Sequence, residues 1–242
     1  MIAIFGGGEI AERGIVPVVG ECRIITQAEC DVRDAEAVTT VSLSLGGLSA
    51  LVFTAGMSRP QAARHSGWQD FRDEVETNLI GAFNVATIGA RWFRPIPLIF
   101  VASLAGLYGK PNHSGYSASK AGLISLVQSL AMEGHNAYAI SPGRVDTAMR
   151  ERDYPGEDPR TRLDPLVIGH LVKDILDDRY TPGDNLVIRM RGHEVLPVEI
   201  HRGDGWRERL KVGEPTTWCA AGTSTSSTDR PGSAGCAVMA GS

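Results

Sequence analysis

Residues 98–120 read LIFVASLAGLYGKPNHSGYSASK and join a short apolar run to the start of a long helical pattern. The apolar run, residues 98–102, has the length and composition of a strand that is buried on both faces. The helical pattern begins near Tyr116 and continues to about residue 132. A buried strand followed by a helix is the repeating unit of a parallel α/β sheet.

The same unit recurs along the chain. Similar apolar runs occupy residues 2–5, 22–26, 50–54, 137–140 and 185–189, and helix-length segments lie at 9–19, 34–45, 68–93, 116–132 and 166–178. This alternation predicts a single α/β domain with a Rossmann-type, doubly wound parallel sheet. In such sheets ligands bind beyond the carboxyl ends of the strands, where the strand order reverses.

The predicted domain extends over residues 1–212. From Gly213 onward Thr, Ser, Gly and Ala dominate, so we expect residues 213–242 to form a disordered, low-complexity tail. The link from the second apolar run to Asp31 is too short to hold a crossover helix. We therefore expect a trimmed pocket on that side of the sheet.

Composition narrows the class of ligand. The formal net charge is −4 with acids and bases interspersed, which does not favour nucleic acid or an anionic membrane as a partner. No apolar stretch approaches the roughly 18 to 20 residues of a membrane span, and no secretion signal precedes the first strand, so a cytoplasmic protein is expected. The four cysteines form no CxxC pair or Cys/His cluster, so neither a metal nor a disulfide is expected. A small-molecule substrate is favoured.

Tyr116 and Lys120 are four residues apart and should share one face of the predicted helix. An ammonium beside a phenol stabilises the phenolate, which would bring the tyrosine pKa, ordinarily about 10, closer to neutral. Ser103, at the end of the preceding strand, could hold the oxygen of a carbonyl or an alcohol. The alternatives are an exposed helical pair and a serine that only caps the backbone. The first interpretation indicates proton transfer by Tyr116.

Four further segments occur in a consistent order along the chain. They are Thr54-Ala-Gly after a strand, Asn78 within a helical pattern, Ser103-Leu-Ala-Gly, and Ser141-Pro-Gly-Arg-Val-Asp-Thr after another strand. Together with Tyr116 and Lys120 they resemble the short-chain dehydrogenase/reductase family, from about residue 1 to 189. The resemblance implies an NAD(P)-dependent oxidoreductase that interconverts a ketone and a secondary alcohol.

The resemblance also implies a role for each catalytic candidate. Tyr116 would be the general acid or base, Lys120 would lower its pKa and hold the nicotinamide ribose hydroxyls, and Ser103 would orient the substrate oxygen. Asn78 would support a water-linked proton path. The alternative for Asn78 is a local hydrogen bond or a water-facing position, and Asn84 is interpreted as structural.

Cofactor contacts follow from the same resemblance. The residues it assigns to NAD or NADP are Gly6, Gly7, Gly8, Glu9, Ile10, Asp31, Val32, Thr54, Ala55, Gly56, Tyr116, Lys120, Pro142, Gly143, Val145 and Thr147. The Val145 backbone and the Thr147 hydroxyl would meet the nicotinamide carboxamide, and Asp31 would meet the adenine amino group. The alternative for Asp31 is a cap on the helix that starts near residue 34.

The glycine-rich start departs from the family pattern Gly-x-x-x-Gly-x-Gly. Counting from Gly6, the second and third glycines are replaced by Ile10 and Glu12. A side chain there is expected to crowd the loop, and a carboxylate would repel a pyrophosphate unless it points away. NAD(H) is favoured over NADP(H), because Glu9 stands where NADP-preferring relatives often carry a cation.

Substrate recognition is expected from residues 57–68 and 148–164, which follow the catalytic strands. Arginine forks suit carboxylate or phosphate, so an anionic substrate is one hypothesis. For these arginines, ion pairs with nearby acids are favoured over substrate binding. For His113, a solvent-facing position is favoured over a place at the mouth of the substrate pocket. The arginines concerned are Arg59, Arg64, Arg150, Arg152, Arg160 and Arg162.

Two other functions remain open on the sequence alone. One is an epimerase or dehydratase that works by transient oxidation, although such relatives usually have a larger carboxyl-terminal domain. The other is a non-catalytic sensor or subunit that has lost tight cofactor binding through Ile10 and Glu12. The helices at 68–93 and 116–132 resemble those at the family's subunit interfaces, which implies a homodimer or homotetramer.

Overall fold

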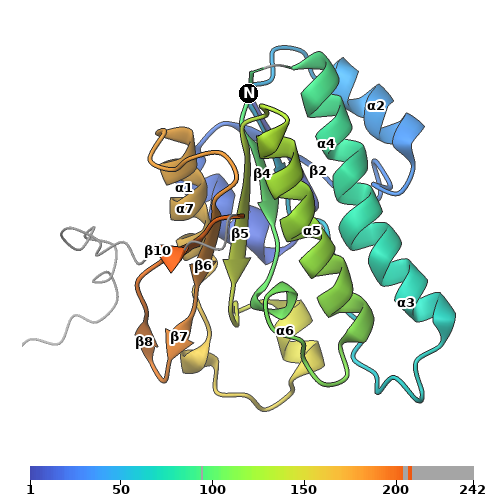
Figure 1. The fold of residues 1–242 in the computed structure, drawn as a ribbon, viewed down its shortest axis with the longest axis vertical. Coiled ribbons are helices and arrows are strands. Elements are labelled where there is room, and N and C mark those ends of the chain that lie inside the picture. The colour runs from blue at the N-terminus through green and yellow to red at the C-terminus, as the bar shows by residue number, and fades with distance from the viewer. Residues whose placement is uncertain (94, 204–206, 209–242) are drawn as a thin grey trace, which may run out of the picture. The chain divides into compact units, whose positions relative to one another are not determined.

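A computed structural model describes residues 1–93, 95–203 and 207–208, which belong to a compact unit, Met1–Lys211. Six parallel strands form most of its main sheet, in the order β2-β1-β3-β4-β5-β6. β9 pairs antiparallel with β6, and β10 pairs with β9 (Figure 1). The bounds are β1 (Ile2–Phe5), β2 (Cys22–Ile25), β3 (Ala50–Phe53), β4 (Leu98–Val101), β5 (Ala137–Pro142), β6 (Asn185–Ile188), β9 (Glu199–His201) and β10 (Arg207–Glu208). A separate small hairpin joins β7 (Met190–Arg191) to β8 (Glu194–Val195).

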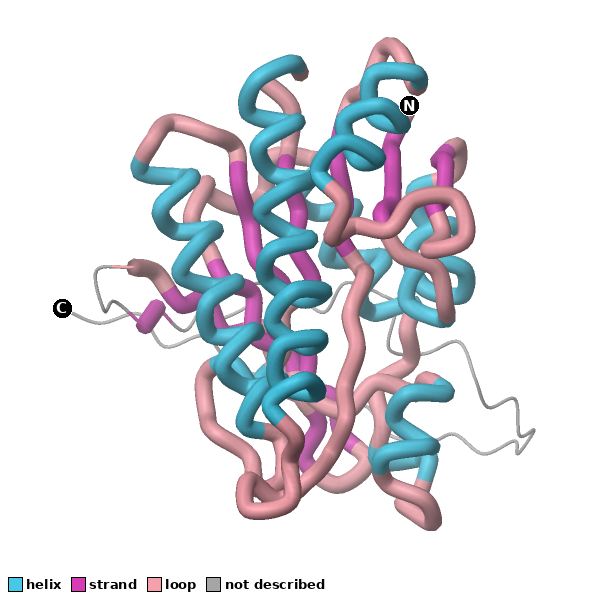
Figure 2. Tube along the Cα trace, turned by 90° about the vertical axis from the view of Figure 1, so that its right-hand side faces the viewer, coloured by secondary structure: helices cyan, strands magenta, loops and turns pink. Residues whose placement is uncertain are grey.

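Helices cover both faces of this sheet. The π-helical segment η1 and α1 pack against α7 on one face, whereas α2, α3, α4 and α5 form the layer on the other. Figure 2 views that second layer in front of the strands. The bounds are η1 (Ile10–Ile15), α1 (Val16–Val19), α2 (Ala35–Ser44), α3 (Trp68–Val75), η2 (Glu76–Ile80), α4 (Gly81–Trp92), η3 (Leu104–Gly106), α5 (Ser114–Met132), α6 (Ala148–Asp153), η4 (Pro159–Thr161) and α7 (Leu166–Leu176).

The central strands are buried throughout, as their continuous apolar sequences require. Every residue of β1, β3, β4, β5 and β6 is buried, and the rings of Phe5, Phe53 and Phe100 are fully enclosed. Burial of each such side chain is worth about 1.5–3 kcal/mol relative to exposure. Helices on both faces explain why these strands carry no alternating polar residues.

Two glycines let the first helical segment approach α7 closely. A Cβ on Gly169 would lie 2.1 Å from the Gly14 carbonyl oxygen, and a Cβ on Gly14 would lie 2.5 Å from the Pro165 carbonyl oxygen. Only a residue without a side chain fits at either position. This contact fixes η1, which follows the glycine-rich loop.

The predicted doubly wound α/β fold is confirmed. Residues 26–34 contain no helix, in agreement with the short link expected there. The long helix predicted at 68–93 is divided by the π-helical turn η2 into α3 and α4. The predicted tail at 213–242 lies outside the described residues, as does the predicted end of the domain at residue 212.

None of the described helices is long and apolar enough to cross a membrane. Within the same residues, no group of three or more His, Cys, Asp or Glu side chains is placed to hold a metal ion. Cys22 and Cys30 are free thiols.

Candidate active site

Two neighbouring pockets open at the carboxyl ends of the parallel strands. The larger has a volume of about 440 Å³ and the smaller about 120 Å³, and the two share Ile10, Thr54, Gly56, Thr147 and Met149 in their walls. Of the predicted site residues, the larger pocket is lined by Gly6, Gly7, Gly8, Glu9, Ile10, Asp31, Val32, Thr54, Ala55, Gly56 and Thr147. The smaller is lined by Ser103, Tyr116, Lys120, Pro142, Gly143 and Val145, as well as by Ile10, Thr54, Gly56 and Thr147. The fold thus brings the predicted residues together, and Asn78 lies buried beside them.

Tyr116 and Lys120 share one face of α5. The Lys120 Nζ lies 5.7 Å from the centre of the Tyr116 ring and donates a 2.9 Å hydrogen bond to the Val101 carbonyl at the end of β4. Lys120 is buried, and burial lowers its pKa to about 8. An exposed helical pair is therefore excluded.

The pKa of the Tyr116 phenol is raised, not lowered. Burial is the main cause, a hydrogen bond with the Ser103 side chain works in the opposite direction, and the carboxylates of Asp153 and Glu74 raise it further. The expectation that the Tyr116 pKa lies closer to neutral is therefore wrong for the protein without cofactor. Desolvation of the phenol dominates, and the buried Lys120 ammonium is itself destabilised.

Ser103 follows β4 and begins the short helix η3. Its Oγ accepts a 3.1 Å hydrogen bond from the Ala105 N–H, and the side chain is buried beside the Tyr116 phenol. Ser103 therefore caps the backbone and also reaches the reactive hydroxyl. η3 fits against α5 because Gly106 has no Cβ, which would lie 2.7 Å from the Lys120 carbonyl.

Asn78 is fully buried in the π-helical turn η2, a conformation often found at functional sites. Its Oδ1 accepts from the Met57 N–H at 2.8 Å, and its Nδ2 donates to the Met57 carbonyl and to the Ser119 Oγ at 3.0 Å each. These partners exclude both the local and the water-facing alternatives. Asn78 ties the loop after β3 to α5.

Asn84 has a structural role, as interpreted from the sequence. Its Nδ2 donates to the carbonyls of Val32 and Arg33 at 2.9 and 3.3 Å. It therefore holds the loop that lines the far end of the larger pocket.

The three consecutive glycines form the turn by themselves. Gly6 and Gly8 have φ values of 115° and 90°, and a Cβ on Gly6 would lie 2.3 Å from the Ala55 nitrogen. Nothing lies within 4 Å of a Cβ built on Gly8, so the loop is open at that point. Glu12 is exposed and absent from the walls of both pockets. The carboxylate therefore lines neither pocket, but it lies beside the glycine turn, because its Oε1 would be 3.8 Å from a Cβ on Gly7.

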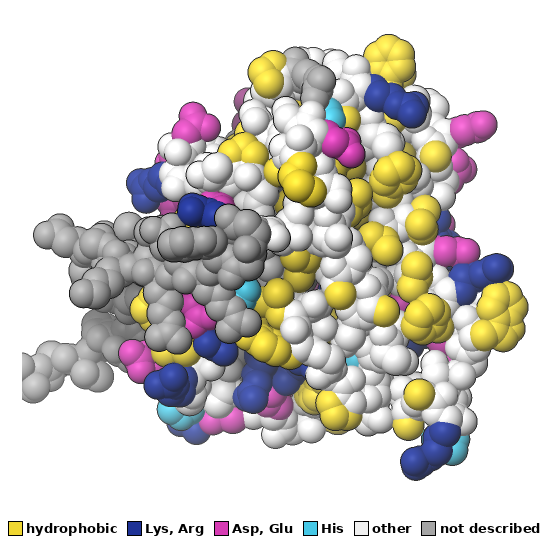
Figure 3. Space-filling view, in the orientation of Figure 1, with side chains coloured by type: hydrophobic (Ala, Val, Ile, Leu, Met, Phe, Trp, Pro, Cys, Tyr) yellow, Lys and Arg dark blue, Asp and Glu magenta, His cyan; other side chains and the backbone are white. Residues whose placement is uncertain are grey.

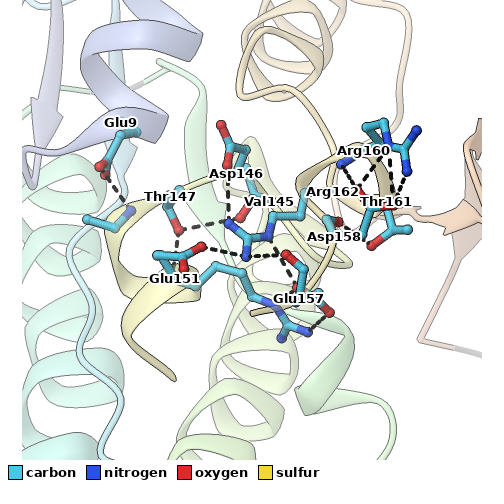
Figure 4. A network of polar contacts seen from close by, with 12 residues as sticks. Glu9, Val145, Asp146, Thr147, Glu151, Glu157, Asp158, Arg160, Thr161 and Arg162 are labelled. Atoms are coloured by element: carbon cyan, nitrogen blue, oxygen red, sulfur yellow. Dashed lines mark hydrogen bonds and ion pairs between the residues drawn. The ribbon is translucent and has the colours of Figure 1, made fainter. Parts of the chain in front are cut away.

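Glu9 links the glycine-rich loop to the segment after β5. Its Oε1 accepts a 3.0 Å hydrogen bond from the Ala148 N–H, at the start of α6 (Figure 4). Arg13 forms a second link, 3.3 Å from Asp146. Because Glu9 also lines the larger pocket, it places a negative charge there.

The far end of the larger pocket contains an ion pair that the sequence did not reveal. Arg33 contacts the Asp31 carboxylate at 2.6 Å and holds the pKa of Asp31 below its usual value. Asp34 caps α2 through the N–H groups of Glu36 and Ala37, so the alternative of Asp31 as the cap is wrong. The sequence signal that could have predicted this ion pair is Arg33, which follows Asp31 by two residues.

The segment at 144–164 is organised by a buried arginine (Figure 4). Arg162 lies 2.7 Å from Glu151, 3.3 Å from Glu157 and 3.4 Å from Asp146. Glu157 in turn accepts two hydrogen bonds from Arg150, which lower the pKa of its carboxyl. We call this group the lid network.

Most arginines considered as anion-binding candidates have acidic partners, which confirms the favoured interpretation for them. Besides the lid network, the pairs are Arg152 with Asp153, Arg160 with Asp158, and Arg59 with Asp70 and Asp73. Arg64 donates to the His65 ring instead.

His113 is buried and lines the smaller pocket, so the solvent-facing interpretation is wrong. Its Nδ1 contacts the Pro111 carbonyl at 2.9 Å, and its Nε2 lies 3.2 Å from the Tyr154 hydroxyl. The same pocket contains Lys110 and Asp153, which sequence reasoning did not single out.

Glu74 was also missed. This buried carboxylate accepts from the Arg59 N–H at 2.8 Å, and a Cβ on Gly115 would lie 2.3 Å from its Oε2. Glu74 therefore packs against the start of α5, just before Tyr116. Burial raises its pKa.

A family model described as short chain dehydrogenase matches residues 15–158. The chain is 42% identical over 108 residues to an uncharacterized short-chain type dehydrogenase/reductase, y4vI, of Sinorhizobium fredii, which covers 42% of this chain and 20% of that protein. It is 34% identical over 132 residues to the 3-oxoacyl-[acyl-carrier-protein] reductase MabA of Mycobacterium avium, covering 50% of this chain and 52% of the relative. The chain thus spans about half the length of MabA and less of y4vI.

Solved structures have the same fold. A putative short-chain alcohol dehydrogenase from Sinorhizobium meliloti aligns with a TM-score of 0.61 at 28% identity, over 69% of this chain and 74% of that one. The protein ElxO, solved with NADP bound, aligns with a TM-score of 0.64 at 18% identity, over 77% and 96% of the two chains. The latter likeness concerns the fold alone.

Proposed function

The chain belongs to the short-chain dehydrogenase family of NAD(P)-using oxidoreductases, and we propose that it interconverts a ketone and a secondary alcohol. One observation carries the proposal. Tyr116, Ser103 and Lys120 line a single small pocket that shares a wall with a larger, glycine-lined one. Proton transfer and hydride transfer need such adjoining sites.

The larger pocket suits a nicotinamide dinucleotide. Gly6 and Gly8 have conformations that favour glycine, and the space beside Gly8 is open, so backbone could approach a phosphate closely. Asp31 and Val32 would meet the adenine, and Val145 and Thr147 the carboxamide. The bound cofactor would supply or accept the hydride, which no side chain can carry.

The side chains in the smaller pocket would divide the remaining work. In reduction, Tyr116 donates its phenolic proton to the substrate oxygen, and Ser103 holds that oxygen by a hydrogen bond. Lys120 keeps one N–H on the Val101 carbonyl and directs its charge to the ribose hydroxyls and the phenol. Asn78 keeps the loop after β3 in place against α5.

We propose NAD(H) as the preferred cofactor. Two arginines line the larger pocket, and both already have carboxylate partners: Arg33 with Asp31, and Arg59 with Asp70. Glu9 adds a negative charge to the pocket, and this charge would repel the 2′-phosphate of NADP(H). These features support a cofactor without that phosphate.

The sensor alternative rested on Ile10 and Glu12. Glu12 lines neither pocket and gives it no support, whereas Ile10 lines both, so the cofactor titration below is the test of this alternative. We also propose a homodimer or homotetramer. Trp68, Phe71, Ile80, Phe83 and Trp92 are exposed on α3, η2 and α4, and Figure 3 shows hydrophobic side chains along that side of the molecule. Large apolar side chains that gather on one face are typical of an interface. Light scattering of the purified chain would give its mass.

The function is tested by binding and turnover. NADH and NADPH are titrated while nicotinamide fluorescence is followed, and small ketones are then supplied with the tighter cofactor. We expect micromolar binding of NADH and one NADH oxidised per alcohol formed. If neither cofactor binds below 1 mM concentrations, the dehydrogenase proposal fails. Product formed with no net NADH consumption would instead indicate an epimerase.

A further inference from the structure

The smaller pocket contains a lysine, Lys110, that forms no ion pair with any carboxylate in the described part of the chain. Lys110 lies in the loop between η3 and α5 and lines the pocket together with Ser103 and Tyr116. It is partly buried, and no carboxylate in the described part of the chain lies within 4 Å of its ammonium. A partly buried lysine without an acidic partner is costly for the folded protein.

The other charged groups of this pocket are compensated. Arg150 makes two hydrogen bonds to Glu157, and Asp153 forms a 2.7 Å ion pair with Arg152. Glu157 favours the charged form of Lys110, but it is already shared among arginines. Burial lowers the pKa of Lys110, and the neighbouring Arg150 and Arg144 lower it further.

The loop that carries Lys110 is held in place. Tyr154 lies parallel to the His113 ring, with centres 5.7 Å apart, and its hydroxyl contacts the His113 Nε2. The Arg150 guanidinium packs over Tyr154 at 3.6 Å. These contacts join α6 to the loop before α5. They hold the loop that carries Lys110 against α6.

We propose that Lys110 binds an anionic group, a carboxylate or a phosphate, on the substrate whose carbonyl Tyr116 protonates. This inference rests on the proposed function and names its substrate class. The pocket volume of about 120 Å³ suits a short oxo acid or oxo phosphate. A point charge on a flexible stem can accept either anion.

The test compares matched substrates and matched variants. 3-Oxobutanoate is compared with its methyl ester, and hydroxyacetone phosphate with hydroxyacetone, as ketone substrates with NADH. Lys110→Met removes the pocket charge and keeps the length of the side chain. Lys173→Met is the control, because Lys173 is an exposed residue of α7 that pairs with Asp177. Circular dichroism and thermal unfolding verify that both variants fold.

We expect wild type to prefer the anionic member of at least one pair by roughly tenfold to a hundredfold in kcat/KM, the usual strength of a hydrogen bond to a charged group. Lys110→Met should lose that preference, with a smaller effect on its rate with the neutral ketone, whereas Lys173→Met should match wild type. The pair that shows the preference distinguishes carboxylate from phosphate. Equal rates on both members in wild type, or a preference that survives in Lys110→Met, would overturn the inference.

A binding measurement separates this inference from the proposed function. The thermal midpoint of the protein without cofactor is measured with acetate and with inorganic phosphate. A rise in wild type that Lys110→Met lacks supports the anion site even if no ketone is reduced, in which case the dehydrogenase proposal alone fails. If neither anion has a Lys110-dependent effect and no ketone is reduced, both ideas fall.

Discussion

The two pockets differ in what forms their walls. The larger is lined by the turn at Gly6–Gly8, by the loops that follow β1, β2 and β3, and by charged side chains such as Asp31 and Arg33. The smaller is lined by polar side chains that include Ser103, Tyr116 and Lys120. The glycine turn tolerates the changes at Ile10 and Glu12, because its shape depends on φ angles that Gly6 and Gly8 supply. A pocket lined by reactive side chains does not tolerate a change of residue type.

The largest effect should come from Tyr116→Phe, which removes only one hydroxyl from the smaller pocket. We expect kcat to fall by roughly 10³-fold, because the proton donor is lost. The dissociation constant of NADH, measured by fluorescence, should change less than about twofold. A variant that keeps most of its turnover would show that the small pocket is not the reaction site.

Lys120→Met should reduce activity nearly as much, and it should also weaken NADH binding, because the Lys120 Nζ lies 3.6 Å from a Cβ built on Gly56, a residue that lines both pockets. Unlike most losses of function, this one should raise stability. Burial that lowers a lysine pKa from 10.5 to about 8 corresponds to a destabilisation of roughly 3 kcal/mol at neutral pH. Thermal unfolding at pH 7 should therefore show a higher midpoint for the variant. A lower midpoint would mean that the hydrogen bond to Val101 outweighs the cost of burial.

The same residue predicts a dependence on pH. Below about pH 8 Lys120 is protonated in both the folded and the unfolded chain, and its destabilising effect is complete. Between about pH 8 and 10.5 the unfolded chain holds the proton and the folded chain does not, so this residue makes stability rise with pH. The stability difference between wild type and Lys120→Met should therefore shrink across that window. NADH affinity of wild type should fall in the same window as the ammonium is lost.

Arg162→Met addresses the segment after β5, which the lid network organises. Loss of the buried guanidinium leaves Glu151 and Glu157 without their shared partner and loosens the lid network. We expect kcat/KM for the ketone to fall roughly tenfold through misplacement of the substrate, with NADH affinity little changed. Arg160→Met, at an exposed pair with Asp158, should have almost no effect. Equal effects of the two variants would contradict a specific role for the lid network.

The smallest effect is expected at the larger pocket. Glu9→Gln keeps an oxygen that can accept the Ala148 hydrogen bond and removes the charge. NADH should bind roughly three- to tenfold more tightly, and the gain should diminish at high salt. Glu12→Gln provides the control, since Glu12 is exposed and lines neither pocket. An unchanged affinity in Glu9→Gln would show that Glu9 lies away from the bound phosphates.

Much of the fold and of the reactive pair follows from the sequence. Apolar runs at regular intervals specify the parallel sheet, and the helical period specifies that Tyr116 and Lys120 share a face. Both features depend on residues that are close together in the sequence. The strand ends then bring the loops of the two pockets together, because parallel strands all end at one edge.

The rest depends on contacts between distant segments, which no local pattern encodes. The place of Glu12 outside both pockets depends on how η1 packs on α7. The burial of Glu74 depends on the absence of a side chain at Gly115, and the acid nearest in effect to Lys110, Glu157, is paired with Arg150 and Arg162. The raised pKa of Tyr116 likewise results from the depth of the folded pocket, which the spacing to Lys120 does not reveal.

The contact between Gly14 and Gly169 makes the position of the first loop depend on a helix from the carboxyl-terminal half of the chain. α7 lies far along the sequence from the turn at Gly6–Gly8, yet its backbone is the surface on which the helix after that turn rests. A methyl group added at residue 169 would clash with the Gly14 carbonyl and displace this helix, and Gly8 and Glu9 would move with it. The two positions should therefore be inherited as a pair, and a change in one would be tolerated only with a compensating change in the other.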